Sequence, residues 1–232
     1  MKIANLPRNI AIIPDGNRRW AKSNSFSIFN GYEIGVKKFM DFSEWCLGYG
    51  INSIAVWAFS TENFSRSRNE VNVLFRIYNK VARDKEILRK LHENRTRLRV
   101  IGNLSMLPKR LVEGLGKLEE ETSIYKERAI NMLMGYGGQD DILHAARALV
   151  QQHAEPSEIS RESFSRYLIS SSMPDIDFII RTSGEHRLSG LMPWQTSYSE
   201  LYFSRKLWPE FTRNDLRRAL LDYNERQRRF GR

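Results

Sequence analysis

The chain has 232 residues, of which 41% are hydrophobic, and these values exclude a disordered protein because a sizeable core can be buried. Its single cysteine, Cys46, excludes a disulfide framework and any multi-cysteine metal site. The net charge of +10 favours an anionic partner: nucleic acid, a phosphorylated small molecule or an anionic membrane surface. A solvated basic face explains the charge equally well. Because lysine and arginine form no dense cluster, the nucleic-acid interpretation is the weaker one.

The first residues carry no recognisable secretion signal. The apolar run Ile10–Ile13 is far shorter than the roughly 7–15 residues of a signal peptide's apolar region. No run approaches the roughly 20 apolar residues that a membrane helix needs. We therefore expect a soluble, cytoplasmic protein, which agrees with its low cysteine content.

Short apolar segments alternate with longer amphipathic segments along the chain. The apolar segments predict buried strands at Ile10–Ile13, Ser53–Phe59, Leu98–Ile101, Ala129–Met134 and Asp177–Ile180. The amphipathic segments predict helices at Gly31–Leu47, Glu70–His92, Pro108–Ser123, Asp140–Gln152, Arg161–Ile169 and Thr212–Phe230. This alternation predicts one α/β domain over residues 1–232, with a central, mostly parallel sheet of about six strands flanked by helices.

The segment Glu70–His92 is long for a helix of a globular protein. Its apolar residues keep helical spacing, which predicts one buried face. That face could form the wall of a hydrophobic tunnel, although ordinary core packing is the simpler interpretation.

Polar residues follow the predicted strands where each one ends, which is where doubly wound α/β proteins bind ligands. The first strand leads into Pro14–Trp20. Gly16 would allow the backbone to approach a ligand closely, and a helix beginning near Arg18 would direct its free amides at that ligand. The side chains of Arg18 and Arg19 are cationic donors suited to phosphate. Asp15 is the hard oxygen ligand that Mg²⁺ prefers. A simple turn explains Asp15 and Gly16, but it does not explain the paired arginines.

Two further strand ends carry similar chemistry. Ser60, Asn63 and Arg66 follow the second strand, although hydroxyl groups here could simply cap the next helix. Arg181 and Arg187 follow the fifth strand and have the makings of a diphosphate clamp, because the planar guanidinium group forms bidentate, charge-assisted hydrogen bonds. A surface salt-bridge loop is the alternative. Three strand ends of one sheet carry residues that can bind anions, and separate structural explanations for all three are less favoured than one shared binding site.

Four of these segments, IAIIPDGNRRWAK, WAFSTENFSR, IIRTSGEHRLS and PWQTSYSELYF, closely resemble signature segments of the cis-prenyltransferases, the undecaprenyl diphosphate synthase-like enzymes. The step Tyr136-Gly137-Gly138 fits as well, and the resemblance runs in order from about Asn9 to Gly231. It implies an α/β fold with a hydrophobic tunnel and a Mg²⁺-dependent enzyme. Such an enzyme condenses an allylic prenyl diphosphate with isopentenyl diphosphate, releases diphosphate and is a homodimer.

The resemblance also implies roles for individual residues. Asp15, Ser60 and Asn63 would be catalytic, and Asp15 and Glu200 would bind the metal ion, Glu200 across a dimer interface. The donor diphosphate would be bound by Gly16, Asn17, Arg18, Arg19 and Arg66, and the acceptor diphosphate by Arg181, Arg187 and Ser189. Subunit contacts would involve Glu70 and Glu200–Phe203, and peripheral contact with a membrane is left open. A hydrophobic pocket would be lined by Trp20, Tyr32, Phe59, Phe64 and Met134, each of which also fits an ordinary core.

The chain departs from the family pattern at three places. A histidine that usually precedes the first strand is Asn9, and the family's Arg-x-x-Gly-His block reads Ile28-Phe29-Asn30-Gly31-Tyr32. Tyr-Gly-Gly-Arg ends here in Gln139. Tyrosine cannot replace imidazole as a base near neutral pH, since its reference pKa is roughly 10. We therefore expect a remodelled donor site with a short product.

These departures leave other functions open. Similar substitutions occur in members of the lavandulyl diphosphate type, so an irregular enzyme that accepts dimethylallyl diphosphate or a small alcohol is an alternative. A non-catalytic subunit of a heteromeric synthase is less favoured, because the aspartate and the clamp residues are retained. A nucleic-acid-binding module is supported only by the charge.

Overall fold

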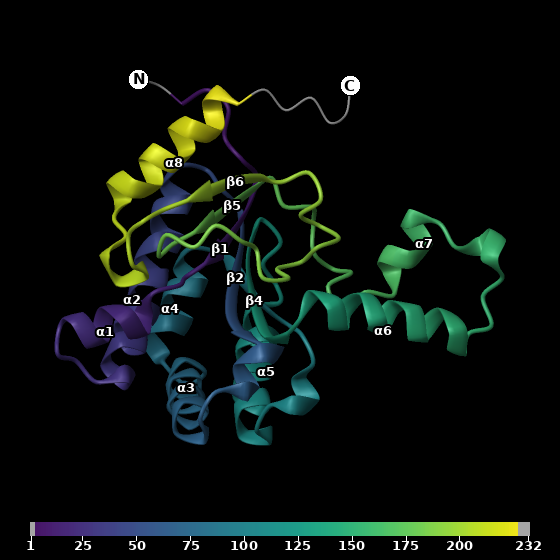
Figure 1. Ribbon diagram of the computed structural model, residues 1–232, viewed down its shortest axis with the longest axis horizontal. Helices are drawn as coiled ribbons and strands as arrows, with labels where there is room; N and C mark the ends of the chain where they lie inside the picture. Colours follow the sequence, from purple (N-terminus) through teal and green to yellow (C-terminus); the bar gives the residue numbers. More distant parts are fainter. Residues whose placement is uncertain (1–2, 227–232) are drawn as a thin grey trace.

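The computed structural model describes residues 3–226, and a six-stranded sheet runs through its centre (Figure 1). The strands are β1 (Asn9–Ile13), β2 (Ser53–Ser60), β3 (Thr96–Ile101), β4 (Arg128–Tyr136), β5 (Phe178–Arg181) and β6 (Glu200–Phe203). Their order is β3-β4-β2-β1-β5-β6, and every neighbouring pair is parallel. The predicted α/β fold is therefore confirmed. Because all strands are parallel, their carboxyl ends meet at one edge of the sheet.

Helices flank the sheet as predicted. They are α1 (Asn17–Ser23), α2 (Ile28–Gly48), α3 (Arg68–Val81), α4 (Lys85–Glu93), α5 (Lys109–Thr122), α6 (Gly138–Gln151), α7 (Arg161–Arg166) and α8 (Arg213–Glu225). Short 3₁₀ helices lie at η1 (Thr61–Ser65), η2 (Leu104–Met106), η3 (Pro156–Glu158) and η4 (Trp208–Glu210). The predicted helix Thr212–Phe230 has its expected Thr212 cap, but its last residues lie outside the described part of the chain.

The predicted single helix Glu70–His92 is wrong, because the chain breaks it into α3 and α4. Ala82 ends α3, and the side chain of Asp84 accepts hydrogen bonds from the amides of Glu86 and Ile87 to begin α4. An aspartate in this position satisfies amides that a continuous helix would bond to its own backbone. The apolar spacing passes through the break and therefore conceals it. The predicted helix Arg161–Ile169 ends early, at Arg166. Beyond this end, the amide of Ile169 donates to Asp141 Oδ1 at 2.6 Å and not to the helix backbone.

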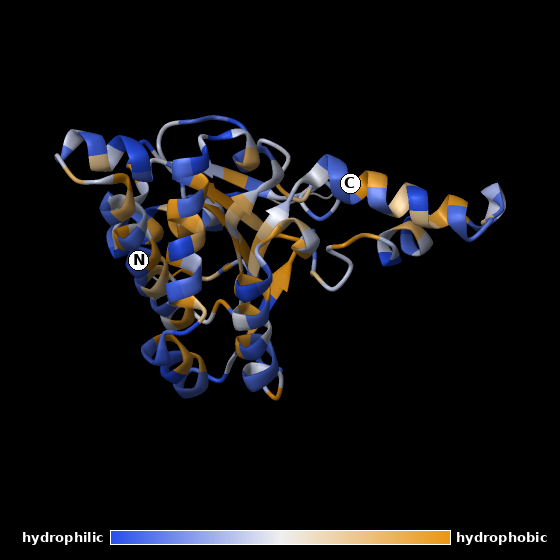
Figure 2. Cartoon of the chain, turned by 90° about the horizontal axis from the view of Figure 1, so that it is seen from below, coloured by the Kyte–Doolittle hydropathy of each residue, from blue (hydrophilic) through white to orange (hydrophobic). Residues whose placement is uncertain are grey.

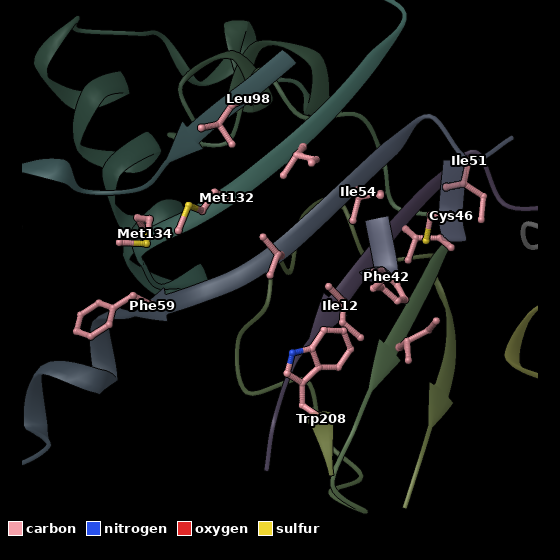
Figure 3. Close-up of a cluster of buried hydrophobic side chains, with 14 of the residues drawn as sticks. Ile12, Phe42, Cys46, Ile51, Ile54, Phe59, Leu98, Met132, Met134 and Trp208 are labelled. Atoms are coloured by element: carbon pink, nitrogen blue, oxygen red, sulfur yellow. The ribbon is translucent and has the colours of Figure 1, made fainter. Parts of the chain in front are cut away.

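The main core lies on one face of the sheet, between the strands and α2, α3, α4, α5 and α8. Figure 3 shows part of it, where Ile12 of the sheet lies beside Phe42 of α2 and Trp208. Phe42 and Trp208 meet edge to face with ring centroids 5.6 Å apart. The opposite face has a smaller core, which includes Leu191 and Met192 of the irregular segment that follows β5. The thicker helical layer is the one that contains the cavity described below.

Helices α6 and α7 project away from the rest of the molecule (Figure 1). This arm exposes apolar side chains, with 50% of Leu143, 76% of Val150 and 46% of Ile159 accessible to solvent. Among residues 3–226, no helix combines the length and the apolar character that crossing a membrane requires.

Candidate functional site

A cavity of about 770 Å³ opens at the edge where the carboxyl ends of the strands meet. Its mouth is formed by residues that follow β1, β2 and β5 and by the beginnings of α1 and α2. From there the cavity runs inward between the sheet and helices α2 to α5. Most of the residues that the sequence predicted for diphosphate binding and catalysis line this mouth, namely Asp15, Gly16, Asn17, Arg18, Arg19, Ser60, Asn63, Arg66, Arg181, Arg187 and Ser189.

Asp15 follows β1 directly and lies in the centre of the mouth. Its Oδ1 accepts a hydrogen bond from the amide of Gly16 at 2.7 Å, and its Oδ2 accepts one from Arg181 Nη2 at 3.1 Å. Arg19 Nη2 lies 3.8 Å from the same Oδ2. Asp15 is 35% exposed, so one side of the carboxylate still faces the cavity. The two cations and the amide hold this carboxylate in one orientation.

Gly16 is the residue that allows the chain to turn from β1 into α1. Its φ of 107° lies in the left-handed region that favours glycine. A Cβ atom here would lie 2.9 Å from Leu207 Cδ2, which is too close. Next to it, Asn17 donates from Nδ2 to the carbonyl oxygen of Pro14 at 2.8 Å, while its buried Oδ1 has no donor within the described residues. Gly35 of α2 provides the space for that Oδ1.

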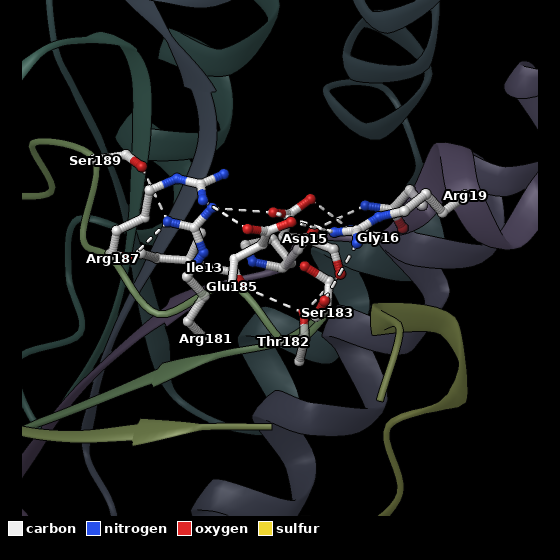
Figure 4. A network of polar contacts seen from close by, with 12 residues as sticks. Ile13, Asp15, Gly16, Arg19, Arg181, Thr182, Ser183, Glu185, Arg187 and Ser189 are labelled. Atoms are coloured by element: carbon white, nitrogen blue, oxygen red, sulfur yellow. Dashed lines mark hydrogen bonds and ion pairs between the residues drawn. The ribbon is translucent and has the colours of Figure 1, made fainter. Parts of the chain in front are cut away.

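The loop after β5 forms one side of the mouth (Figure 4). Arg181 is 5% exposed, and its Nη1 donates to the carbonyl oxygen of Arg187 at 2.5 Å and to Ser189 Oγ at 3.0 Å. Ser183 and Ser189 both have positive φ values, 82° and 53°. Such values are uncommon outside glycine and asparagine and cluster at functional sites. The loop therefore wraps around the buried guanidinium group of Arg181.

Glu185 is a mouth residue that the sequence analysis did not assign. Its carboxylate lies 2.6 Å from Arg187 Nη1 and 3.4 Å from Arg19 Nη2 (Figure 4). Arg19 Nη1 also donates to the carbonyl oxygen of Ser183 at 3.3 Å, so Arg19 joins α1 to the β5 loop. The signal was present in the sequence, since Glu185 lies between the two arginines of the predicted clamp.

A second charged cluster lies on the helical side of the mouth. Glu70 is buried at 8% exposure, and its carboxylate pairs with Arg66 Nη1 at 2.9 Å and Arg18 Nη1 at 3.1 Å. Tyr32 Oη donates to Glu70 Oε1 at 3.1 Å and accepts from Arg66 Nη1 at 2.7 Å. The structure does not support the expected subunit contact by Glu70, because its carboxylate is buried and paired within the same chain.

Burial raises the pKa of the Tyr32 hydroxyl to about 12, because the charges of Arg66 and Arg18 offset only part of the desolvation cost. The hydroxyl therefore stays protonated near neutral pH and acts as a fixed hydrogen-bond donor. The ring of Tyr32 lines the cavity, as predicted. Ile28, four residues earlier on α2, is 43% exposed and does not line the cavity.

Ser60 and Asn63 lie together at the end of β2. The amide of Ser60 donates to Asn63 Oδ1 at 3.2 Å, which ties the end of the strand to η1. Both residues line the cavity.

The interior of the cavity is apolar. It is lined by Val36, Phe39, Met40, Val56, Leu74, Val81, Ile87, Leu91, Leu98, Leu118, Ile130 and Met132. The Tyr78 hydroxyl in this wall donates to the carbonyl oxygen of Ala58, and burial raises its pKa. The predicted pocket residues Trp20, Phe59, Phe64 and Met134 are not among the lining residues. Phe59 instead packs against Phe64 and Phe75, with centroids 4.9 Å and 5.2 Å away, and Trp20 stacks on Phe26.

The mouth offers an oxygen ligand of the kind that Mg²⁺ prefers. Mg²⁺ is commonly held by one or two carboxylates together with substrate phosphates and water, and Asp15 presents a partly exposed carboxylate to the cavity. The mouth therefore fits such an ion. Glu200 does not approach Asp15 within this chain: it begins β6 opposite Phe178, whereas Asp15 follows the other ends of the strands. Glu200 pairs instead with Arg226 Nη1 at 2.8 Å.

The charges of the mouth favour a dense anion. Among the lining residues there are five arginines and three carboxylates, and the arginines remain in excess when Glu70 beneath them is added. An anion with several oxygens would find cations on both sides of the opening, from α1 and from Arg66 after η1 on one side and from the β5 loop on the other. An apolar group attached to that anion would extend into the interior. The cavity thus fits an amphiphile with an anionic head and a hydrocarbon tail.

Comparison with known proteins gave consistent results. Residues 13–231 match the family described as "Putative undecaprenyl diphosphate synthase". An isoprenyl transferase of Thermus thermophilus is 41% identical over 98% of this chain and 89% of its own length. A tritrans,polycis-undecaprenyl-diphosphate synthase of Thermoplasma acidophilum, described as geranylgeranyl-diphosphate specific, is 40% identical over 97% of this chain and 89% of its own length.

Solved structures show the same likeness. A lavandulyl diphosphate synthase from Lavandula x intermedia, in complex with dimethylallyl diphosphate, superimposes with a TM-score of 0.91 at 33% identity. That alignment covers 98% of this chain and 99% of the synthase. A probable undecaprenyl diphosphate synthase from Campylobacter jejuni has a TM-score of 0.81 at 30% identity, covering 98% and 100% of the two chains.

Proposed function

We propose that this chain, which belongs to the undecaprenyl diphosphate synthase family of prenyltransferases, condenses an allylic prenyl diphosphate with isopentenyl diphosphate and gives a short product. The observation that carries the proposal is the single cavity with an arginine-lined mouth and an apolar interior. A prenyl diphosphate has these two parts in the same order. The reaction breaks the allylic C–O bond of the donor, forms a C–C bond to the acceptor and releases diphosphate and a proton.

The two charged clusters supply two anion sites. Arg18 and Arg66, with Gly16, Asn17 and Arg19, would bind the donor diphosphate on the helical side of the mouth. Arg181, Arg187 and Ser189 would bind the acceptor diphosphate in the β5 loop. Charge accumulates on the donor diphosphate as its C–O bond breaks, so fixed cations stabilise the transition state more than the bound substrate. The apolar interior then keeps water from the allylic cation.

Asp15 would hold Mg²⁺ together with oxygen atoms of the substrate. When bound, the ion would supply positive charge that stabilises the departing diphosphate. The chain's own contribution is to orient the Asp15 carboxylate through Gly16, Arg19 and Arg181. Glu200 from another copy of the chain would also help to hold the ion.

Ser60 and Asn63 would orient the reacting carbons and pass the released proton onward, since both line the cavity. Tyr32 would not accept that proton, because its hydroxyl already donates to Glu70 and its pKa is about 12. A neutral group therefore occupies the position for which the family pattern described above implies a histidine.

Tyr32 and Ile28 favour a second candidate function, an irregular prenyl transfer to dimethylallyl diphosphate or a small alcohol. Ile28 provides no charge for a donor diphosphate, and Tyr32 provides no base near neutral pH. The solved lavandulyl diphosphate synthase, which resembles this chain over almost its full length, was crystallised with dimethylallyl diphosphate. The non-catalytic subunit is less favoured, because Asp15, Arg181 and Arg187 are retained and line the cavity.

A homodimer is part of the proposal. The arm of α6 and α7 exposes Leu143, Val150 and Ile159, and exposed apolar side chains that gather on one projection favour a contact with another chain. Sedimentation of the purified protein would measure its state of association.

The proposed reaction is tested by incubating purified protein with Mg²⁺ and paired substrates. Donors are dimethylallyl, geranyl, farnesyl and geranylgeranyl diphosphates, and acceptors are isopentenyl diphosphate, dimethylallyl diphosphate and a small alcohol. Products are identified by mass spectrometry, with Asp15→Ala as the blank. Extension by isopentenyl diphosphate supports the first function, and prenylation of either other acceptor supports the second. No product from any pair, with rescue by a partner chain, would support the non-catalytic subunit.

A further inference from the structure

The connection between α1 and α2, residues 24–28, forms an exposed apolar elbow beside the mouth. Phe26 is 47% exposed and Ile28 is 43% exposed. Phe26 stacks on Trp20 of α1 with ring centroids 5.3 Å apart and planes inclined by 7°. In Figure 2 this elbow lies at the far left of the molecule, where a partly orange turn follows the mostly blue helix α1. The stacking fixes an aromatic ring in an exposed position at an edge of the molecule.

The elbow is continuous with the wall of the cavity. Ile28 begins α2, and Tyr32, one turn later, lines the cavity together with Val36 in the next turn. Residues at these spacings lie on one face of a helix. A single apolar face of α2 therefore runs from the interior of the cavity, past the mouth, to the surface at the elbow.

Positive charge surrounds the elbow. Between Gly16 and Tyr32 the sequence holds Arg18, Arg19 and Lys22 and no carboxylate. Lys22 is exposed and makes no ion pair within the described residues. The loop after β6 also exposes Arg205 and Lys206, and the Lys206 carbonyl oxygen accepts from the amide of Ser183 in the β5 loop. The segments that adjoin the elbow therefore carry an excess of positive charge.

We propose that the elbow is the surface by which this protein contacts an anionic lipid membrane. Reversible membrane binding commonly combines a small inserted apolar surface with attraction of basic residues to anionic headgroups. The elbow supplies both contributions at one place. An aromatic side chain is well suited to the boundary between headgroups and acyl chains.

This inference rests on the proposed function in one respect, the identity of the cargo. A prenyl diphosphate product has a hydrocarbon tail that is costly to expose to water on leaving the cavity. With the elbow in the lipid surface, the apolar face of α2 would lead the tail from the interior directly into the acyl region. The diphosphate would meanwhile pass along the arginines of the mouth.

The lipid occupant is favoured over a protein partner by the charge around the elbow. Ile124 provides a contrast, because it is 71% exposed but lies close to Glu119, Glu120 and Glu121 in the sequence. An apolar side chain beside acidic residues would be repelled by an anionic membrane. Ile124 is therefore a matched control for exposure without cationic surroundings.

The test is sedimentation of the full chain with lipid vesicles in the absence of substrates. Vesicles of phosphatidylcholine alone are compared with vesicles that also contain phosphatidylglycerol. Wild-type protein should bind the anionic vesicles, and Phe26→Ser should bind on the order of tenfold more weakly, because an aromatic ring no longer enters the apolar layer. Lys22→Glu should also weaken binding, and Ile124→Ser should bind like the wild type. Circular dichroism spectra establish that all variants are folded.

The inference is overturned if the wild type does not bind anionic vesicles, if Phe26→Ser binds as well as the wild type, or if Ile124→Ser loses as much as Phe26→Ser. Equal binding to both kinds of vesicle also contradicts it. Prenyl transfer is assayed separately without vesicles, where Phe26→Ser should keep wild-type activity because Phe26 does not line the cavity. Loss of vesicle binding with activity retained counts against the elbow alone, and vesicle binding without activity counts against the proposed reaction alone.

Discussion

The mouth and the interior of the cavity are built by different means. In the mouth, charged side chains from several elements hold one another: Arg19 of α1 joins Asp15 to Glu185, and Glu70 of α3 joins Arg18 to Arg66. In the interior, aliphatic side chains from α2 to α5 simply face the sheet. The role of the mouth therefore depends on how its charged groups are oriented, whereas the role of the interior depends on the volume that its side chains enclose. Substitutions in the two regions should change different properties of the same reaction.

The largest effect is expected from Asp15→Asn, which keeps the size of the side chain and removes its charge. We expect about a 10³-fold loss of kcat, comparable to the removal of a group that stabilises transition-state charge. Steady-state assays with saturating Mg²⁺ measure the loss. Asp41→Asn, at an exposed residue of α2, is the control and should be unchanged. Retention of more than about a tenth of the activity would contradict the central place given to Asp15.

A smaller effect is expected from Arg187→Ala. Arg187 is 59% exposed and its removal leaves the buried Arg181 in place, so the fold should be retained. A charge-assisted hydrogen bond contributes about 1.5–3 kcal/mol, which corresponds to a roughly 10- to 150-fold higher KM for isopentenyl diphosphate. The donor KM should change little. Arg217→Ala on α8 is the control, and an equal rise in both KM values would place Arg187 in the wrong site.

Tyr32 belongs to both regions, because its hydroxyl bonds to the charged cluster and its ring lines the cavity. Two variants distinguish the role of the hydroxyl from that of the ring. Tyr32→Phe removes hydrogen bonds to the charged groups of Glu70 and Arg66 and should lower kcat/KM at least about tenfold, the value of about 1.5 kcal/mol, without changing the pH profile. The wild-type hydroxyl stays protonated up to its pKa of about 12. Any stability that the neutral hydroxyl provides is therefore complete below its unfolded pKa of roughly 10 and is lost only as pH rises through 12.

Tyr32→His should add a new ionisation to the pH profile of kcat/KM, because the reference pKa of histidine is about 6.5. Profiles of wild type, Tyr32→Phe and Tyr32→His between pH 5.5 and 9.5, measured about every half unit, make the comparison. If the wild type and Tyr32→Phe differ in their apparent pKa values within this range, the hydroxyl titrates and the interpretation is wrong.

The smallest effect on rate is expected inside the cavity. Ile87→Phe on α4 adds volume to the wall, so the product distribution should shift towards shorter chains while kcat/KM for a short donor stays within about twofold. Mass spectrometry of the products measures the shift. Val73→Phe on α3, outside the cavity lining, is the control. If Ile87→Phe changes the donor KM and leaves product length unchanged, the mouth and the interior do not control different properties of the reaction as proposed.

The sequence predicted the sheet and the mouth better than it predicted the walls. Strand ends can be read from local patterns, and in a parallel sheet they meet at one edge, so Asp15, Ser60 and Arg181 could be brought together in advance. β6 was not assigned because Glu200–Phe203 is only four residues long and no residue of it is fully buried. The break between α3 and α4 was missed because the apolar spacing continues through it, although Asp84 was a readable cap.

Glu70 and the pocket residues could not be predicted from local signals. Glu70 lies in the first turn of α3, where a glutamate is ordinary, and only the packing of α1 and α2 against α3 brings Arg18 and Tyr32 to it. Phe59 was expected in the pocket as part of the signature segment WAFSTENFSR. The register of β2 against β4 shifts on both sides of Phe59, and its ring packs with Phe64 instead of lining the cavity.

The break between α3 and α4 also bears on how such a protein can diversify. Ile87 and Leu91 of α4 reach the inner part of the cavity, whereas α3 contains Glu70 and so is tied to the charged mouth. Because Asp84 begins α4 as a helix of its own, its inward residues can be exchanged over generations without shifting the register of α3. Under the proposed function, substitutions in this nine-residue helix would therefore alter the size of the product and leave the charged mouth in place.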